Sequence, residues 1–191
     1  MSKTRMEAFS DGVIAIIITI MVLELQVPGE PTWSALQPLA PVFFSYVLSF
    51  VYIAIYWNNH HHLLQAVQRV NGRVLWANSH LLFWLSLVPF VTAWMGENQF
   101  APVPVAVYGV VLICAAFAYY ILAHALISHH GRESALAKAL GSDFKGKISP
   151  VLYAVGILLS FVNSWLAFGV YVLVAVIWLI PDRRIERIIS D

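Results

Sequence analysis

Charged residues are scarce in this chain, where Asp, Glu, Lys and Arg make up only 11% of 191 residues. Soluble domains carry about 25% charged residues, which they need to cover a surface that faces water. Hydrophobic residues make up 60% of the sequence, and the mean hydropathy is +0.77. The few charges stand in clusters between long apolar stretches. This composition excludes soluble, secreted and disordered proteins and predicts a polytopic membrane protein.

The sequence also lacks the motifs of the common enzyme classes. The only cysteine, Cys114, lies in an apolar segment, so no intrachain disulfide forms and the thiol is expected to be a small buried group. There is no H-E-x-x-H, no Walker loop and no G-x-S-x-G. Asp11 and Glu24 lie about 20 Å apart along one expected helix, too far to act as an acid/base pair. We therefore expect no enzyme. A net charge of +1 makes a nucleic-acid partner equally unexpected.

The apolar stretches are long enough, or nearly so, for six membrane-spanning helices, each of which takes roughly 20 residues. Breaks of charge, proline or glycine separate the first four, and Pro89 inside the third predicts a kink. The run 148–180 is too long for one span and barely enough for two, with its turn expected at Asn163 and Ser164. The sequence thus predicts an all-α membrane protein with one six-helix domain over residues 1–191. The expected spans are 9–27, 36–57, 74–95, 103–127 and two within 148–180.

The positive charges support six spans. With the amino terminus inside, all eleven Lys and Arg residues fall in inner segments and none in the outer loops. A single span over 148–180 would instead place the last three arginines outside. Residues 182–190 fit either a short interfacial helix or a frayed flank of the last span.

Polar residues gather at the inner ends of the expected helices. All seven histidines belong to this layer, together with Ser10, Asp11 and Asn78. Three interpretations stay open: hydrogen bonds that tie the helices together, a metal or tetrapyrrole site, and a pH-sensitive role. No carboxylate or cysteine stands at close ligand spacing to the histidines, so the first interpretation is favoured and no metal is expected.

The first expected helix carries an aliphatic stripe. At 100° per residue, one face presents Ile16, Thr19, Ile20 and Leu23, while Ser10 and Asp11 point away from it toward neighbouring helices. Taken alone, such a stripe is typical of a lipid-facing or packing surface.

One motif changes this interpretation. Arg5-x-x-x-Phe9-Ser10-Asp11, at the inner end of the first span, closely resembles the signature of the potassium channels of the transmembrane protein 175 family. The segment Tyr-Trp-Asn-Asn-His-His at residues 56–61 is also similar to that family, and the resemblance covers essentially the whole chain.

The resemblance implies a channel without a T-V-G-Y-G filter, and this sequence contains none. In such a channel the first helix of each of four subunits lines the pore, and rings of bulky aliphatic side chains make its narrowest points. Carried onto this chain, the constriction is Ile16, then Ile20 or Thr19, then Leu23. The motif residues would form a structural lock, namely Arg5, Phe9, Ser10 and Asp11. The candidate partners of the motif are Trp57, Asn58, His60 and His61.

The sequence therefore predicts a homotetrameric channel of the prokaryotic type that passes potassium ions passively through a bacterial inner membrane, without a cofactor. Membrane lipid and three further copies of the chain are its expected partners. The alternative is a membrane binding or redox protein that uses the histidine layer for a metal or tetrapyrrole.

The charge pattern makes one prediction about topology. A reporter fused after Asp191 should signal from the cytoplasm, because six spans return the chain to the side where it began. Reporter activity in intact cells measures this, and a periplasmic signal would require an odd number of spans.

Overall fold

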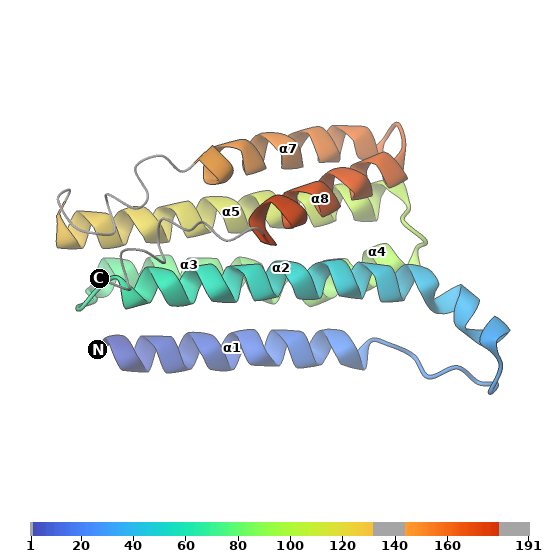
Figure 1. The fold of residues 1–191 in the computed structure, drawn as a ribbon, viewed down its shortest axis with the longest axis horizontal. Coiled ribbons are helices and arrows are strands. Elements are labelled where there is room, and N and C mark those ends of the chain that lie inside the picture. Colours follow the sequence, from blue (N-terminus) through green and yellow to red (C-terminus); the bar gives the residue numbers. More distant parts are fainter. Residues whose placement is uncertain (1, 132–143, 180–191) are drawn as a thin grey trace.

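The computed structural model describes residues 2–131 and 144–179, and this part of the chain is helical without a strand. Figure 1 shows the long helices running side by side, with α1 along one edge of the bundle and α7 along the opposite edge. In chain order the elements are α1 (Lys3–Leu23), the 3-10 helix η1 (Trp33–Leu39), α2 (Ala40–Gln65), α3 (Gly72–Ser86), α4 (Val88–Glu97), α5 (Pro102–His130), α7 (Phe144–Ser160) and α8 (Ser164–Leu179).

Each of the six predicted spans corresponds to helical structure, and the third span is made of α3 and α4 together. Among the residues that the structure describes, four segments are long and apolar enough to cross a membrane, and α8 is a shorter apolar helix. The four segments are Lys3–Leu23, Trp33–Gln65, Gly72–Glu97 and Pro102–His130.

The described part of the run 148–180, residues 148–179, is a helical hairpin as predicted, because α7 ends at Ser160 and α8 begins at Ser164. Asn163 makes the turn: its Oδ1 accepts hydrogen bonds from the N–H groups of Trp165 at 2.9 Å and Leu166 at 3.3 Å. A side-chain oxygen in this position satisfies amides that the first turn of a helix leaves free. The interpretations of residues 182–190 lie outside the described residues.

The second span differs from its predicted limits. It begins at Ala40, with Pro41 in its first turn where a missing N–H costs little, and it continues to Gln65. The prediction that it ends at Trp57 is wrong, because Asn59 and the following histidines remain helical. Packing favours this longer helix, because His60, Leu63 and Leu64 in its last two turns are buried against the bundle.

The third span is interrupted near the predicted kink. The break falls at Leu87, two residues before Pro89, which occupies the first turn of α4. Proline has no N–H to donate to the preceding turn, and its ring crowds the carbonyl four residues earlier, so the helix cannot continue through this point unchanged.

Buried tyrosines join the two halves of the bundle. The Tyr52 hydroxyl of α2 donates to the Tyr171 carbonyl of α8 at 2.6 Å, and the Tyr171 hydroxyl donates to the Val105 carbonyl of α5 at 3.2 Å. The Tyr108 hydroxyl lies 3.0 Å from Ser49 Oγ, which is itself 2.6 Å from Thr92 Oγ1. These hydroxyls have partners inside the protein, as buried polar groups require.

The close approach of α7 to Tyr171 gives a stability prediction. A Cβ added at Gly156 would overlap the Tyr171 ring, so Gly156→Ala forces the ring out of its packed position. We expect the free energy of unfolding to fall by about 1–3 kcal/mol, the usual cost of overpacking. Gly169→Ala in α8 is the matched control, because its Cβ meets no atom within 4 Å. Thermal unfolding of the purified variants measures both, and equal midpoints would contradict the proposed packing.

Candidate pore helix and its polar anchor

One face of α1 packs against the rest of the chain. Its buried residues recur every three or four positions, and α1 contacts α2, α3 and α4. This spacing marks a single helical face, so the contacts fix how α1 is rotated about its own axis. The buried residues are Met6, Ser10, Ile14, Ile17 and Met21.

The predicted stripe lies away from this packed face. Ile16 is 58% exposed, Ile20 42% and Leu23 81%, and Thr19 is also exposed. The Thr19 hydroxyl donates to the Ile16 carbonyl at 2.9 Å, so its proton is used within the helix. In the single chain, α1 therefore presents an aliphatic surface at the open edge of the bundle (Figure 1).

At its inner end, α1 is tied to two other helices by three buried polar residues, here called the Ser10 network: Ser10 of α1, Asn78 of α3 and His60 of α2. Asn78 Nδ2 donates to Ser10 Oγ at 2.9 Å, and Ser10 Oγ donates to the Met6 carbonyl at 2.8 Å. Asn78 Oδ1 lies 2.8 Å from His60 Nε2. Because this oxygen can only accept, His60 must carry its proton on Nε2.

Asp11 makes a second connection beside the Ser10 network. The Trp57 Nε1–H of α2 donates to Asp11 Oδ1 at 3.0 Å, and the Trp57 ring stacks on His61 with 6.1 Å between ring centroids. His61 Nε2 in turn lies 2.8 Å from Gln65 Nε2. An indole N–H is a donor only, so it suits a carboxylate that must be paired at the edge of a bilayer.

The structure does not bring every candidate together. The Arg5 backbone N–H donates to Ser2 Oγ, but its guanidinium makes no hydrogen bond or ion pair with a described residue. Phe9 is exposed on the surface of the single chain. Asn58 is exposed as well, and its side chain makes no hydrogen bond with a described residue.

Asn78 is the partner that sequence reasoning missed. The sequence placed it in the polar layer but did not pair it with the motif. The available signal was its side-chain chemistry, because a carboxamide inside an apolar helix both donates and accepts and must find a partner for each.

The histidines separate into several local pairs. His60 belongs to the Ser10 network, while His80 Nε2 accepts from Trp84 Nε1–H at 2.9 Å. His124 Nδ1 lies 2.9 Å from the Tyr120 carbonyl, one turn earlier in α5. Within residues 2–131 and 144–179, no three His, Cys, Asp or Glu side chains are grouped so that they could hold a metal ion.

Comparison with known proteins places this arrangement in a family. The family model described as endosomal/lysosomal potassium channel TMEM175 matches residues 5–89. The chain is 56% identical over 191 residues to a protein named a potassium channel from Chryseobacterium sp. (strain P1-3), covering 100% of both chains. The chain belongs to the TMEM175 family. The match to the TMEM175 model begins at Arg5 and spans α1, α2 and α3, which are the helices that the Ser10 network joins.

Other TMEM175 relatives extend the similarity beyond this segment. The crystal structure of a lysosomal potassium-selective channel TMEM175 homolog from Chamaesiphon minutus matches with a TM-score of 0.79 and 33% identity, covering 93% of this chain and 96% of that one. The zebrafish protein named endosomal/lysosomal proton channel TMEM175 is 25% identical over 195 residues, but this chain spans only 36% of its length.

The Ser10 network predicts the effect of removing its centre. Asn78→Ala takes the acceptor from the His60 Nε2–H, and a buried unsatisfied donor costs about 1–3 kcal/mol. Asn58→Ala removes the same amide from an exposed position and should stay within about 0.5 kcal/mol of the parent. Thermal unfolding of the two purified variants measures the difference. Equal midpoints would mean that the Ser10 network does not stabilise the fold.

Proposed function

We propose that four copies of this chain assemble into a channel that passes potassium passively through a membrane, with α1 of each copy lining the pore. The observation that carries this proposal is the exposed aliphatic stripe on α1, on a helix whose other face is anchored to the chain. Membership of the TMEM175 family, with relatives named potassium channels, supports it.

The exposed side of α1 is also suited to contact between copies. Ala8, Gly12 and Ala15 are exposed next to the stripe, and no atom lies within 4 Å of a Cβ placed at Gly12. Small residues let helices in a bilayer approach closely, which increases the dispersion energy that holds them together. A homotetramer would cover this surface and place the stripes around a common axis.

In this channel the constriction is formed by Ile16, Leu23 and, between them, Ile20 or Thr19. Aliphatic side chains offer no oxygen to replace water around an ion, so an ion that sheds water there gains nothing in return. The free-energy cost of shedding water is lower for weakly hydrated potassium than for sodium. The channel should therefore favour potassium over sodium only modestly. A narrow apolar constriction also empties of water readily, which gives a means of closure.

The remaining motif residues serve this pore by holding the inner end of α1. Ser10 and Asp11 act through the Ser10 network and through Trp57, and Arg5 and Phe9 complete the lock in the assembled channel. We place the single domain in a bacterial inner membrane with both termini in the cytoplasm. The inner distribution of Lys and Arg and the bacterial relatives support this placement.

The test is conduction through variants of the stripe. Ile16→Ala and Leu23→Ala widen the constriction, so we expect higher conductance and a potassium-to-sodium permeability ratio closer to one. Ile16→Asn wets the constriction and should cause the largest loss of selectivity. Reversal potentials of the purified protein in liposomes, under defined potassium and sodium gradients, give these values.

Leu158→Ala on α7 is the matched control for Leu23→Ala, because it removes the same atoms from a leucine that is 71% exposed on another helix. It should change neither conductance nor selectivity. If Ile16→Ala and Leu23→Ala tetramers conduct as the parent does, the pore is lined elsewhere and the proposal fails.

A further inference from the structure

A groove outside the proposed pore runs between α3 and α5. It consists of two adjoining open depressions of about 420 Å³ and 690 Å³, which share Gly72, Arg73 and Ala125 in their walls. We call it the α3–α5 groove. It begins where α3 starts and α5 ends, which is the inner end of the molecule in the proposed topology.

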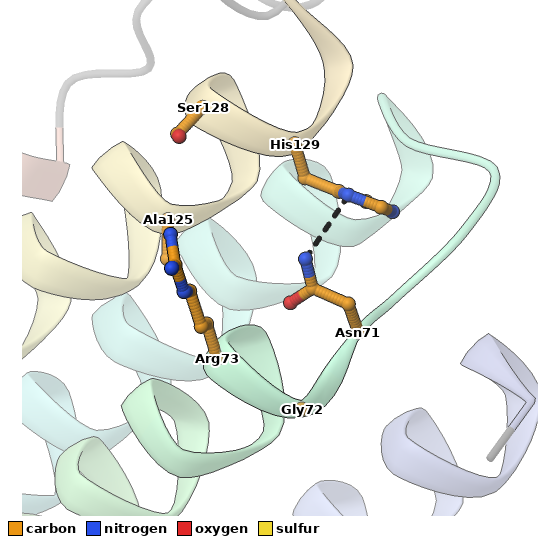
Figure 2. A pocket seen from close by; sticks show the side chains of 6 residues that line it. All are labelled: Asn71, Gly72, Arg73, Ala125, Ser128 and His129. Carbon is orange, nitrogen blue, oxygen red and sulfur yellow. Dashed lines mark hydrogen bonds between the residues drawn. The ribbon is translucent and has the colours of Figure 1, made fainter.

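The end of the groove nearest the helix termini is polar. Figure 2 shows Arg73 reaching from α3 toward Ala125 of α5, with Ser128 and His129 on the opposite wall. Asn71 Nδ2 lies 3.0 Å from His129 Nδ1, and Asn71 Oδ1 accepts from the Val74 N–H at 3.0 Å. Asn71 therefore holds the two walls together while Arg73 supplies a cation. Among the residues that the structure describes, no carboxylate lines either part of the groove.

The other end of the groove is mainly apolar. Its walls include Trp76 and Ala77 of α3 and Ile121 of α5, with His80 further along α3. Trp76 is 79% exposed, and it lies one turn beyond Arg73 in the direction of the membrane interior. The polar and apolar ends are thus ordered along the helices as a lipid's headgroup and acyl chain are ordered across a leaflet.

We infer that the α3–α5 groove binds an anionic phospholipid, with its phosphate beside Arg73, Ser128 and His129 and an acyl chain along Trp76 and Ile121. Basic pockets between transmembrane helices on the cytoplasmic side are suited to anionic headgroups, and tryptophan favours the interface. The apolar end distinguishes a lipid from a free phosphate, which would use only the polar end. The assignment rests on the proposed function for the orientation of the chain in the membrane.

The groove is linked to the proposed pore through α3. This helix carries Arg73 and Trp76 in the groove and Asn78 in the Ser10 network, which holds α1. A lipid that bridges α3 and α5 should therefore raise the thermal stability of the assembled protein.

The test is native mass spectrometry of the purified full-length protein with phosphatidylglycerol or phosphatidylcholine. Removing one cation from a lipid site weakens binding roughly fivefold. We expect Arg73→Gln to lose about this much affinity for phosphatidylglycerol and to approach the level of phosphatidylcholine. Arg69→Gln is the matched control, because Arg69 is an exposed arginine near the same end of α3 that does not line the groove.

Two further measurements distinguish a lipid site in this groove from lipid bound elsewhere on the protein and from a site for phosphate alone. Gly72→Leu should block the groove without disturbing the fold, since a Cβ at Gly72 meets no atom within 4 Å. Inorganic phosphate in large excess should leave phosphatidylglycerol bound. Equal losses in Arg73→Gln and Arg69→Gln, or displacement by phosphate alone, would overturn the lipid site.

Potassium flux through the same preparations keeps the two proposals distinguishable. Normal flux without selective lipid binding overturns only the lipid site. Selective lipid binding by a protein that passes no potassium overturns the proposed channel and leaves the site.

Discussion

The arrangement of α1 depends on one buried carboxamide. Asn78 donates to Ser10 of α1 and accepts from His60 of α2, so its two ends fix three helices at one depth. All three side chains are buried, so no water can replace either bond, and a shift of any of the three helices would leave a polar group unsatisfied. Because Ser10 must face Asn78, the rotation of α1 is set, and Ile16 and Leu23 must face away from the bundle.

The existence of the helices could be predicted from the sequence, but several of their limits could not. Long apolar runs must be helical in a membrane, and charge placement favoured two helices in the run 148–180. The end of α2 at Gln65 depends on packing that the sequence does not reveal, since His60, Leu63 and Leu64 are buried against other helices. The break at Leu87 lies before the proline that causes it, since proline disturbs the turn that precedes it.

The site was predictable to a similar degree. The exposed stripe follows from helical periodicity, and Trp57 was among the candidate partners because it lies in the polar layer near Asp11. Asn78 was not, since pairing between helices depends on how each is rotated about its axis. Only the packed structure places Asn78 between Ser10 and His60.

The two halves of α1 are held by different forces, which bears on how the proposed pore would close. Its inner half is fixed by directional hydrogen bonds from Trp57 and Asn78, whereas its outer half is packed through the aliphatic side chains of Ile17 and Met21. Dispersion between apolar groups has little directional preference, so small rotations cost less there than at the hydrogen-bonded end. In the proposed channel the aliphatic constriction occupies this outer half. A constriction that closes by dewetting needs only a small change in width, and the more weakly constrained half of the helix is where such a change would cost least.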